Sequence, residues 1–213
     1  MKMLLAASLA AAISGPTLAQ DAAPVAEAQC ELHVWPAERF QSMSTSLLGG
    51  GLLDAAIHAD KDKDNKSKLA SALDPQGQLD ALASLDLPRL MNAQSVRVIT
   101  HIDPLDRKTL NKISTRRATS TSPCYSELIV TDLVYTAHPI YGRSMTTAFM
   151  WREFTNAASK PASVGGAGSN RLSLFPPKEG EDFQAASDEL TTVFKANFEE
   201  FARKVAKRAA GRK

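Results

Sequence analysis

The stretch from residue 125 to 154, YSELIVTDLVYTAHPIYGRSMTTAFMWREF, most constrains how this 213-residue chain can fold. It concentrates β-branched and aromatic residues, which favour strands, on both sides of a short turn-forming segment. Residues 138–142 have the composition of a hairpin turn slightly longer than the two-residue type. The sequence therefore predicts two antiparallel strands at the centre of a sheet.

The alternation of side chains predicts which faces of this hairpin are buried. In the second strand one face should be core, and it carries Met145, Thr147, Phe149 and Trp151. In the first strand both faces are largely apolar, since Leu128, Val130 and Val134 alternate with Ile129, Leu133 and Tyr135. A strand with two apolar faces is expected to be covered on both sides.

Shorter strands and several helices are predicted around the hairpin. Strand patterns occur at residues 31–35, 95–102 and 171–175. Helical apolar spacing covers residues 37–59, with a break expected at three consecutive glycines, Gly49 to Gly51, and it resumes from residue 69 to 90. A long amphipathic helix is predicted from residue 183 to 205, with a basic end.

Other segments read as turns and loops. Residues 60–65 alternate acidic and basic side chains and predict a solvated charged turn, and residues 74–77 predict a second turn. Pro88 either begins or ends a helical turn. Residues 155–170 are rich in small residues and glycine, which predicts a flexible loop. Together these elements predict an α/β (α+β) fold: a single domain from residue 30 to 208, with a mixed sheet built around the central hairpin and covered by amphipathic helices, followed by a basic tail at residues 209–213.

The first nineteen residues have the pattern of a signal peptide. Lys2 precedes an apolar run at residues 4–13, and Thr17 and Ala19 supply small side chains for cleavage. We expect cleavage near Ala19, a flexible lead-in at residues 20–29, and a periplasmic or secreted protein. No other long apolar segment follows, so no transmembrane segment is predicted in the mature chain.

Export favours a disulfide between the two cysteines, Cys30 and Cys124. Each cysteine precedes a predicted strand, so the bond predicts that these strands run parallel and lie side by side or one strand apart. The alternative, a lipid-modified Cys30, does not fit the preceding residues Glu27, Ala28 and Gln29, which lack the pattern that lipoprotein processing uses.

No local catalytic signature is present, because neither G-x-S-x-G nor H-E-x-x-H occurs. The four histidines, His33, His58, His101 and His138, are isolated in sequence, although the sheet could bring three of them to one edge. The best candidate for a polar site near the hairpin turn comprises Asp132, Tyr135, His138 and Tyr141. No metal or cofactor is predicted; residues 60–71 lack the Gly and Glu that a calcium-binding loop needs.

Charge is nearly balanced: without the leader, 24 basic side chains face 23 acidic ones, and a net charge near +1 argues against any global electrostatic attraction to nucleic acid or membranes. The one basic cluster in mid-chain lies within the polar segment 103–123 and comprises Lys108, Lys112, Arg116 and Arg117. This segment is either a solvated loop or short helix outside the core, or a contact surface for an acidic partner.

The layout of a short N-terminal strand, helices, a strand ending in HID, the strand pair SELIVTDLVY and YGRSMTTAFMWREF, and a final amphipathic helix resembles a small α/β domain of bacterial envelope proteins. This domain occurs in TolB, LpoB and CsgG. The resemblance covers residues 31–207 and implies a mixed sheet with helices and a binding role without catalysis; no functional residue transfers.

Two functional hypotheses follow. The first is a non-catalytic binding or assembly module of the cell envelope, with other envelope proteins as partners. The second is a small secreted hydrolase or ligand-binding enzyme with a site near His138.

Overall fold

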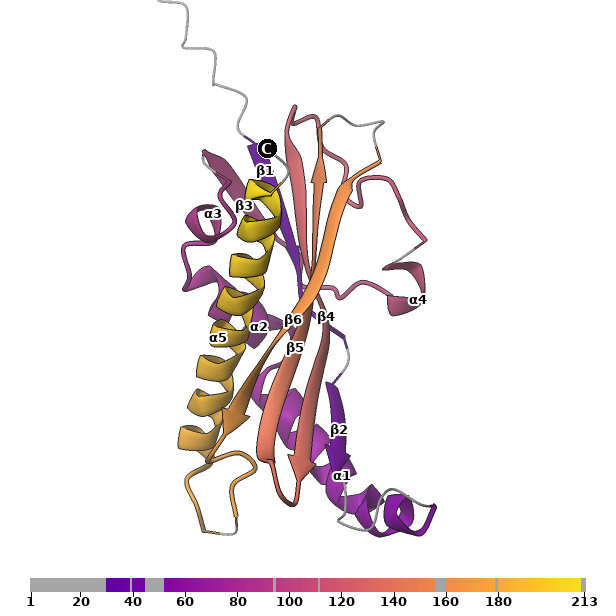
Figure 1. Cartoon of the computed structure of the whole chain (residues 1–213), viewed down its shortest axis with the longest axis vertical. Helices are drawn as coiled ribbons and strands as arrows, with labels where there is room; N and C mark the ends of the chain where they lie inside the picture. Colours follow the sequence, from indigo (N-terminus) through magenta and orange to yellow (C-terminus); the bar gives the residue numbers. More distant parts are fainter. Residues whose placement is uncertain are drawn as a thin grey trace, which may run out of the picture.

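A six-stranded mixed sheet forms the body of the protein, and a long C-terminal helix packs along it (Figure 1). The computed structural model describes residues 30–38, 40–44, 52–93, 95–110, 112–155, 160–178 and 180–211. The predicted leader, the lead-in and the three glycines at residues 49–51 lie outside these residues. The predicted α/β class and mixed sheet are confirmed.

The sheet has the strand order β3-β1-β4-β5-β6, with β2 also paired to β4. Its strands are β1 (Cys30–Trp35), β2 (Phe40–Ser44), β3 (Val96–Thr100), β4 (Tyr125–His138), β5 (Gly142–Phe154) and β6 (Ala162–Leu172). The antiparallel β4–β5 hairpin is central, as predicted. Strands β1 and β2 both pair in parallel with β4, β1 with its first half and β2 with its second half, on the side of β4 that faces away from β5.

The parallel pairing of β1 with β4 confirms the topology predicted from the cysteines. Cys30 and Cys124 form a disulfide, with their Cα atoms 4.7 Å apart and a sequence separation of 94. The backbone N–H of Glu31 donates to the carbonyl oxygen of Cys124 at 2.9 Å, immediately beside the bond. The starts of β1 and β4 are therefore joined by a disulfide and by a backbone hydrogen bond.

A β-bulge in β4 corrects the predicted alternation of that strand. The register with β5 shifts between Val130 and Asp132, so one residue is inserted and later side chains change face. Leu133 consequently joins Leu128 and Val130 in the main core, whereas the simple alternation had placed it on the opposite face. On the hairpin partner β5, the four residues predicted to be core are all buried: Met145, Thr147, Phe149 and Trp151.

The predicted flexible loop at residues 155–170 is wrong over most of its length, because residues 162–172 form the edge strand β6. Its glycines serve close packing. An added Cβ at Gly168 would lie 2.2 Å from the carbonyl oxygen of Asn197, so the backbone of the C-terminal helix approaches the strand to a distance that only glycine permits. Composition indicated a loop, whereas packing against a helix required the same glycines.

The helices are α1 (Leu52–Ala72), α2 (Pro75–Ala83), α3 (Leu87–Leu90), α4 (Arg107–Leu110) and α5 (Phe183–Ala210). Helix α5 covers one face of β5 and β6 with its predicted apolar stripe, in which Leu190, Phe194, Phe198 and Phe201 are fully buried. Asn197 anchors it, because its Nδ2 donates to the carbonyl oxygen of Met145 at 3.0 Å and its Oδ1 accepts from Asn170 at 2.8 Å.

Three further local predictions are corrected. Residues 40–44 form strand β2 and not helix; helical and strand patterns are hard to separate in so short an apolar segment. Residues 60–65 lie inside α1, where Asp64 pairs with Lys68 one turn later, so this charged segment is part of a helix and not a turn. Residues 74–77 begin α2, with Asp74 as its N-cap. Pro88 lies in the first turn of α3. None of the described helices is both long and apolar enough to span a membrane.

Candidate functional site

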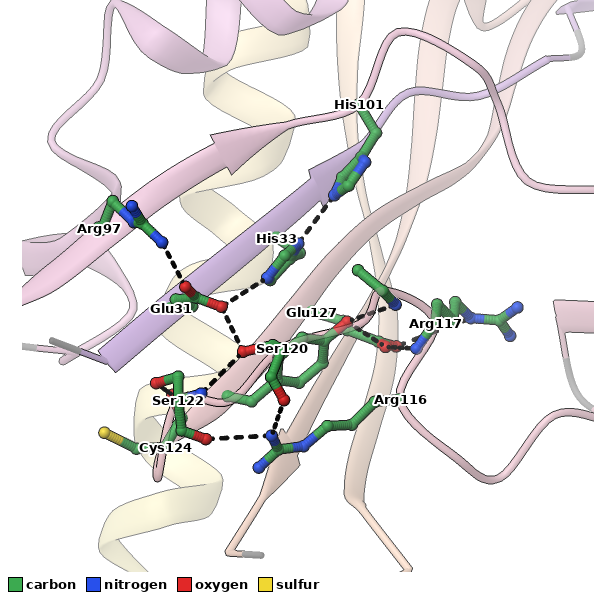
Figure 2. Close-up of polar contacts among 12 residues, drawn as sticks. Glu31, His33, Arg97, His101, Arg116, Arg117, Ser120, Ser122, Cys124 and Glu127 are labelled. Atoms are coloured by element: carbon green, nitrogen blue, oxygen red, sulfur yellow. Dashed lines mark hydrogen bonds and ion pairs between the residues drawn. The ribbon is translucent and has the colours of Figure 1, made fainter. Parts of the chain in front are cut away.

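The face of the sheet opposite α5 carries a cluster of polar side chains that ranges from fully buried, as at Glu127, to exposed, as at Arg97. It arises because alternate residues of β1 point to opposite faces: Leu32 and Val34 enter the main core, whereas Glu31 and His33 point the other way. The register places Glu31 beside Arg97 and Tyr125, and His33 beside Glu127. We call this set the polar cluster, and it comprises Glu31, His33, Arg97, His101, Arg116, Arg117, Ser120, Tyr125, Glu127 and Arg152. Figure 2 labels all of these residues except Tyr125 and Arg152.

Glu31 accepts hydrogen bonds from three directions. Its Oε1 accepts from Arg97 Nη2 at 2.5 Å, and its Oε2 accepts from the hydroxyl of Ser120 and from His33 Nε2 at 3.2 Å. The bond from Ser120, with smaller help from Arg97 and His33, lowers the pKa of Glu31 to about 2. The carboxylate therefore stays ionised although the residue is buried.

Two imidazoles, those of His33 and His101, extend the hydrogen-bonded chain from Glu31 toward the surface. His33 Nδ1 and His101 Nε2 lie 2.8 Å apart, so one of these nitrogens donates a hydrogen bond to the other. The planes of the two rings are inclined by 19°. Trp35 stacks on His101 with centroids 4.2 Å apart. Burial, and secondarily the charge of His33, lowers the pKa of His101. The hydrogen-bonded chain runs from Arg97 through Glu31 and His33 to His101 (Figure 2).

Glu127 is the second fixed negative charge of the polar cluster, and its side chain is fully buried. Arg152 Nη1 donates to its Oε2 at 2.7 Å, and the hydroxyl of Tyr125 donates to its Oε1 at 3.0 Å. The backbone N–H of Arg117 donates to the same Oε1 at 2.8 Å. Burial raises the pKa of Tyr125, so this phenol remains a protonated donor. Burial also lowers the pKa of Arg117 from its usual high value.

The polar cluster holds the segment 103–123 against the sheet. Arg152 Nη2 donates to the carbonyl oxygens of Ile113 and Thr115, and Arg117 Nη2 donates to that of Leu110 at 2.6 Å. The guanidinium of Arg116 lies 4.8 Å from the ring centroid of Tyr125 and donates to the carbonyl oxygens of Ser120 and Ser122. These contacts come from buried or half-buried side chains, so they fix the path of the segment.

The order of groups in the polar cluster does not match nucleophilic catalysis. A catalytic triad needs an imidazole between the hydroxyl and the carboxylate, so that the imidazole can take the hydroxyl proton. Here Glu31 lies between Ser120 and His33, and the hydroxyl donates directly to the carboxylate. Among the residues that the structure describes, no group of three or more His, Cys, Asp or Glu side chains is arranged to hold a metal ion.

The structure places the four residues of the sequence-predicted polar site near the hairpin turn in different surroundings. Tyr135 is buried in the main core against Phe175, with ring centroids 5.5 Å apart. His138 instead caps the turn, because its Nδ1 accepts the backbone N–H groups of Ile140 and Tyr141. Asp132 accepts from Gln41 Nε2 at 3.1 Å. The rings of His138 and Tyr141 are in contact, with their centroids 4.5 Å apart.

The predicted basic surface divides into two parts. Arg116 and Arg117 turn inward as members of the polar cluster, whereas Lys108 and Lys112 are exposed on and just after α4. Of the three histidines considered for one edge, the sheet brings His33 and His101 together, and His138 lies at the hairpin turn. His58 has no described side chain.

Sequence reasoning missed the acidic centres of the polar cluster, Glu31 and Glu127. A usable signal was present in residues 31–35, ELHVW, where Glu31, His33 and Trp35 alternate with two aliphatic residues and so share a face. The partners could not be read from the sequence, because they depend on the register of three strands.

Comparisons with known proteins leave the chain without a family. No protein-family model matches it, and no curated protein matches it. Solved structures with a similar arrangement include a hypothetical protein from Chlamydia trachomatis, at 10% identity and a TM-score of 0.36 over 86% of this chain and 97% of that one. A DUF330 protein from Xanthomonas campestris gives 10% identity, 86% and 89% coverage and a TM-score of 0.36. PelC from Paraburkholderia phytofirmans, solved as a dodecamer, is 12% identical over 86% of this chain and 93% of that one, with a TM-score of 0.23. At these TM-scores the similarities assign no function, and the resemblance to the TolB, LpoB and CsgG domain stays a prediction.

Proposed function

We propose that this chain is an exported, disulfide-closed protein of the cell envelope that acts as a non-catalytic binding or assembly module. The observation that carries the proposal is the use of the polar cluster. Its two buried carboxylates, Glu31 and Glu127, are occupied by internal donors, and its arginines hold the segment 103–123 in place. The cluster therefore supports a surface and does not expose a reactive group.

The surface that it supports presents Lys108 and Lys112. Both side chains are exposed, while Arg117 donates to the carbonyl oxygen of Leu110, which lies between them in sequence, and Arg116 donates to that of Ser122. A positioned pair of cations has a smaller ordering cost on binding than the same pair on an unanchored loop. An acidic face of another envelope protein is the partner that this surface favours.

The alternative of a small hydrolase or ligand-binding enzyme with a site near His138 has less support. The Nδ1 atom of His138 is occupied by two backbone N–H groups of its own turn, so it is not available as a general base. Tyr135, which that hypothesis needed beside it, packs in the core.

A charge-reversal pull-down tests the proposed contact surface. The double variant Lys108→Glu, Lys112→Glu should lose a specific partner from crosslinked envelope extracts and keep the unfolding midpoint of the wild type. A matched control, Lys66→Glu with Lys160→Glu, reverses two exposed lysines outside this segment and should retain the partner. Equal recovery of every partner by all three proteins would count against the surface.

A further inference from the structure

Large apolar side chains are exposed chiefly at one end of the molecule. Among the described residues, five of the eight such side chains lie at the end of β2, in the β4–β5 turn, in the β6–α5 connection and at the start of α5. Figure 1 shows these segments meeting at its lower end. We call these five residues the apolar tip: Met43, Ile140, Tyr141, Leu174 and Phe183.

The turn residues Ile140 and Tyr141 are the most exposed members, at 69% and 71%. Single exposed apolar side chains are ordinary on a protein surface, but adjacent large ones at a turn form a patch that water covers poorly. Apolar patches of this kind mark protein contacts or membrane contacts.

Several backbone N–H groups at the apolar tip have side-chain acceptors within the protein, and this favours a membrane contact over a protein contact. His138 Nδ1 accepts the N–H groups of Ile140 and Tyr141 at 3.1 and 3.2 Å. In the β6–α5 connection, Glu189 accepts three consecutive N–H groups, those of Ser173, Leu174 and Phe175, at 2.6 to 2.9 Å. Backbone donors that already have an acceptor can enter an apolar medium without the cost of losing their hydrogen bonds to water.

A shallow hollow of about 330 Å³ adjoins the apolar tip and carries both signs of charge. Arg143 and Lys178 line it together with Glu181 and Asp182. This mixture of cations and anions complements a zwitterionic headgroup, which carries a phosphate and an amine. The apolar tip is also small, since a stable protein interface needs about 800 Å² from each partner and two large side chains with three half-exposed ones supply less.

We propose that the apolar tip binds a lipid bilayer surface, with Ile140 and Tyr141 inserted at the level of the headgroups and the charged hollow against those headgroups. Tyrosine suits this position because its ring is apolar and its hydroxyl reaches water. The proposal does not depend on the partner surface of Lys108 and Lys112, which belongs to α4 and lies away from this end (Figure 1).

Vesicle flotation with the processed protein, isolated from the envelope fraction and defined by its mass, tests the proposal. The probes are vesicles of phosphatidylethanolamine with phosphatidylcholine, and the same vesicles with phosphatidylglycerol. The variant Ile140→Ser, Tyr141→Ser should partition at least about tenfold more weakly than the wild type, because two large apolar contacts are lost. The control variant Val98→Ser, Ile102→Ser removes exposed apolar side chains elsewhere and should float like the wild type.

A fluorescence measurement gives an independent readout of insertion. The chain has two tryptophans, and both are buried, so their emission should not respond to vesicles. A tryptophan placed at the tip by Tyr141→Trp should shift its emission to shorter wavelength when vesicles are added. Wild-type protein that remains in the aqueous fraction with both vesicle types, or flotation unchanged in the Ile140→Ser, Tyr141→Ser variant, would overturn the proposal. A blue shift of the Tyr141→Trp protein with envelope proteins but not with vesicles would assign the apolar tip to a protein partner instead.

Discussion

Replacing Gly168 with alanine should be among the most damaging single-methyl additions in this protein. The new Cβ would lie 2.2 Å from the carbonyl oxygen and 2.4 Å from the Cα of Asn197, well inside the 3.0 Å that real Cβ atoms keep. Both contacts are with backbone, so no side chain can rotate away. Helix α5 must therefore move outward from β6.

The cost has two parts. Forcing an extra carbon into a packed contact costs about 1 to 3 kcal/mol. Outward movement also weakens the bonds of Asn197 to Met145 and Asn170, at about 1 kcal/mol each. We expect Gly168→Ala to lower the free energy of unfolding by about 3 to 5 kcal/mol, which for a domain of this size lowers the melting temperature by roughly 6 to 20 °C.

Neighbouring glycines of β6 provide matched controls in the same strand. An added Cβ at Gly165 meets only the Phe149 carbonyl oxygen at 4.0 Å, and one at Gly166 meets the Phe201 ring at 3.2 Å. Gly165→Ala should be neutral or stabilising by about 0.5 kcal/mol, because alanine restricts the unfolded chain. Gly166→Ala should fall between the two. Urea unfolding followed by circular dichroism ranks the three variants, and a Gly168→Ala protein as stable as Gly165→Ala would refute the close approach of α5 to β6.

Two further predictions concern the polar cluster. Arg152→Met should destabilise the fold by about 3 to 5 kcal/mol, because it leaves the buried carboxylate of Glu127 without its direct partner; adding Glu127→Gln should restore part of the loss, and a fully stable single variant would contradict this. Stability should also fall in acid. The pKa of Glu31 is depressed to about 2 in the folded state, so its contribution is complete above its ordinary value of 4.5 and is lost as the pH falls toward 2. That shift corresponds to roughly 3 kcal/mol at most, less the screened share from the exposed Arg97. The lowered pKa of His101 adds a loss in the same direction that begins below pH 6.5. Chemical unfolding from pH 7 to pH 3 should show this slope, and Glu31→Gln should flatten its acid part; an equal slope in both proteins would contradict the role given to Glu31.

Sequence patterns predicted the features that depend on local periodicity. The hairpin, the apolar stripe of α5 and the buried face of β5 all follow from side chains that repeat every two or every 3.6 residues. The disulfide between Cys30 and Cys124, together with the strand that follows each cysteine, predicted a parallel pair. These inferences required no knowledge of the register.

Features that depend on long-range packing were missed. The bulge between Val130 and Asp132 changes the face of every later side chain in β4, and a single inserted residue leaves no mark in composition. The glycines of β6 resemble a flexible loop until Asn197 is placed against them. The polar cluster joins Glu31, which lies near the start of the domain, with Ser120 and Arg97 through strand register and loop closure. Its arginines looked like a contact surface because their acidic partners lie far away in sequence.

Intact-mass analysis of the protein purified from the envelope fraction, with and without reduction before alkylation, tests most directly the claim of an exported, disulfide-closed module. The account predicts a mass that begins at Gln20 and no alkylation of Cys30 or Cys124 until the protein is reduced. A chain that retains residues 1–19 and carries two thiols that are alkylated without reduction would contradict it.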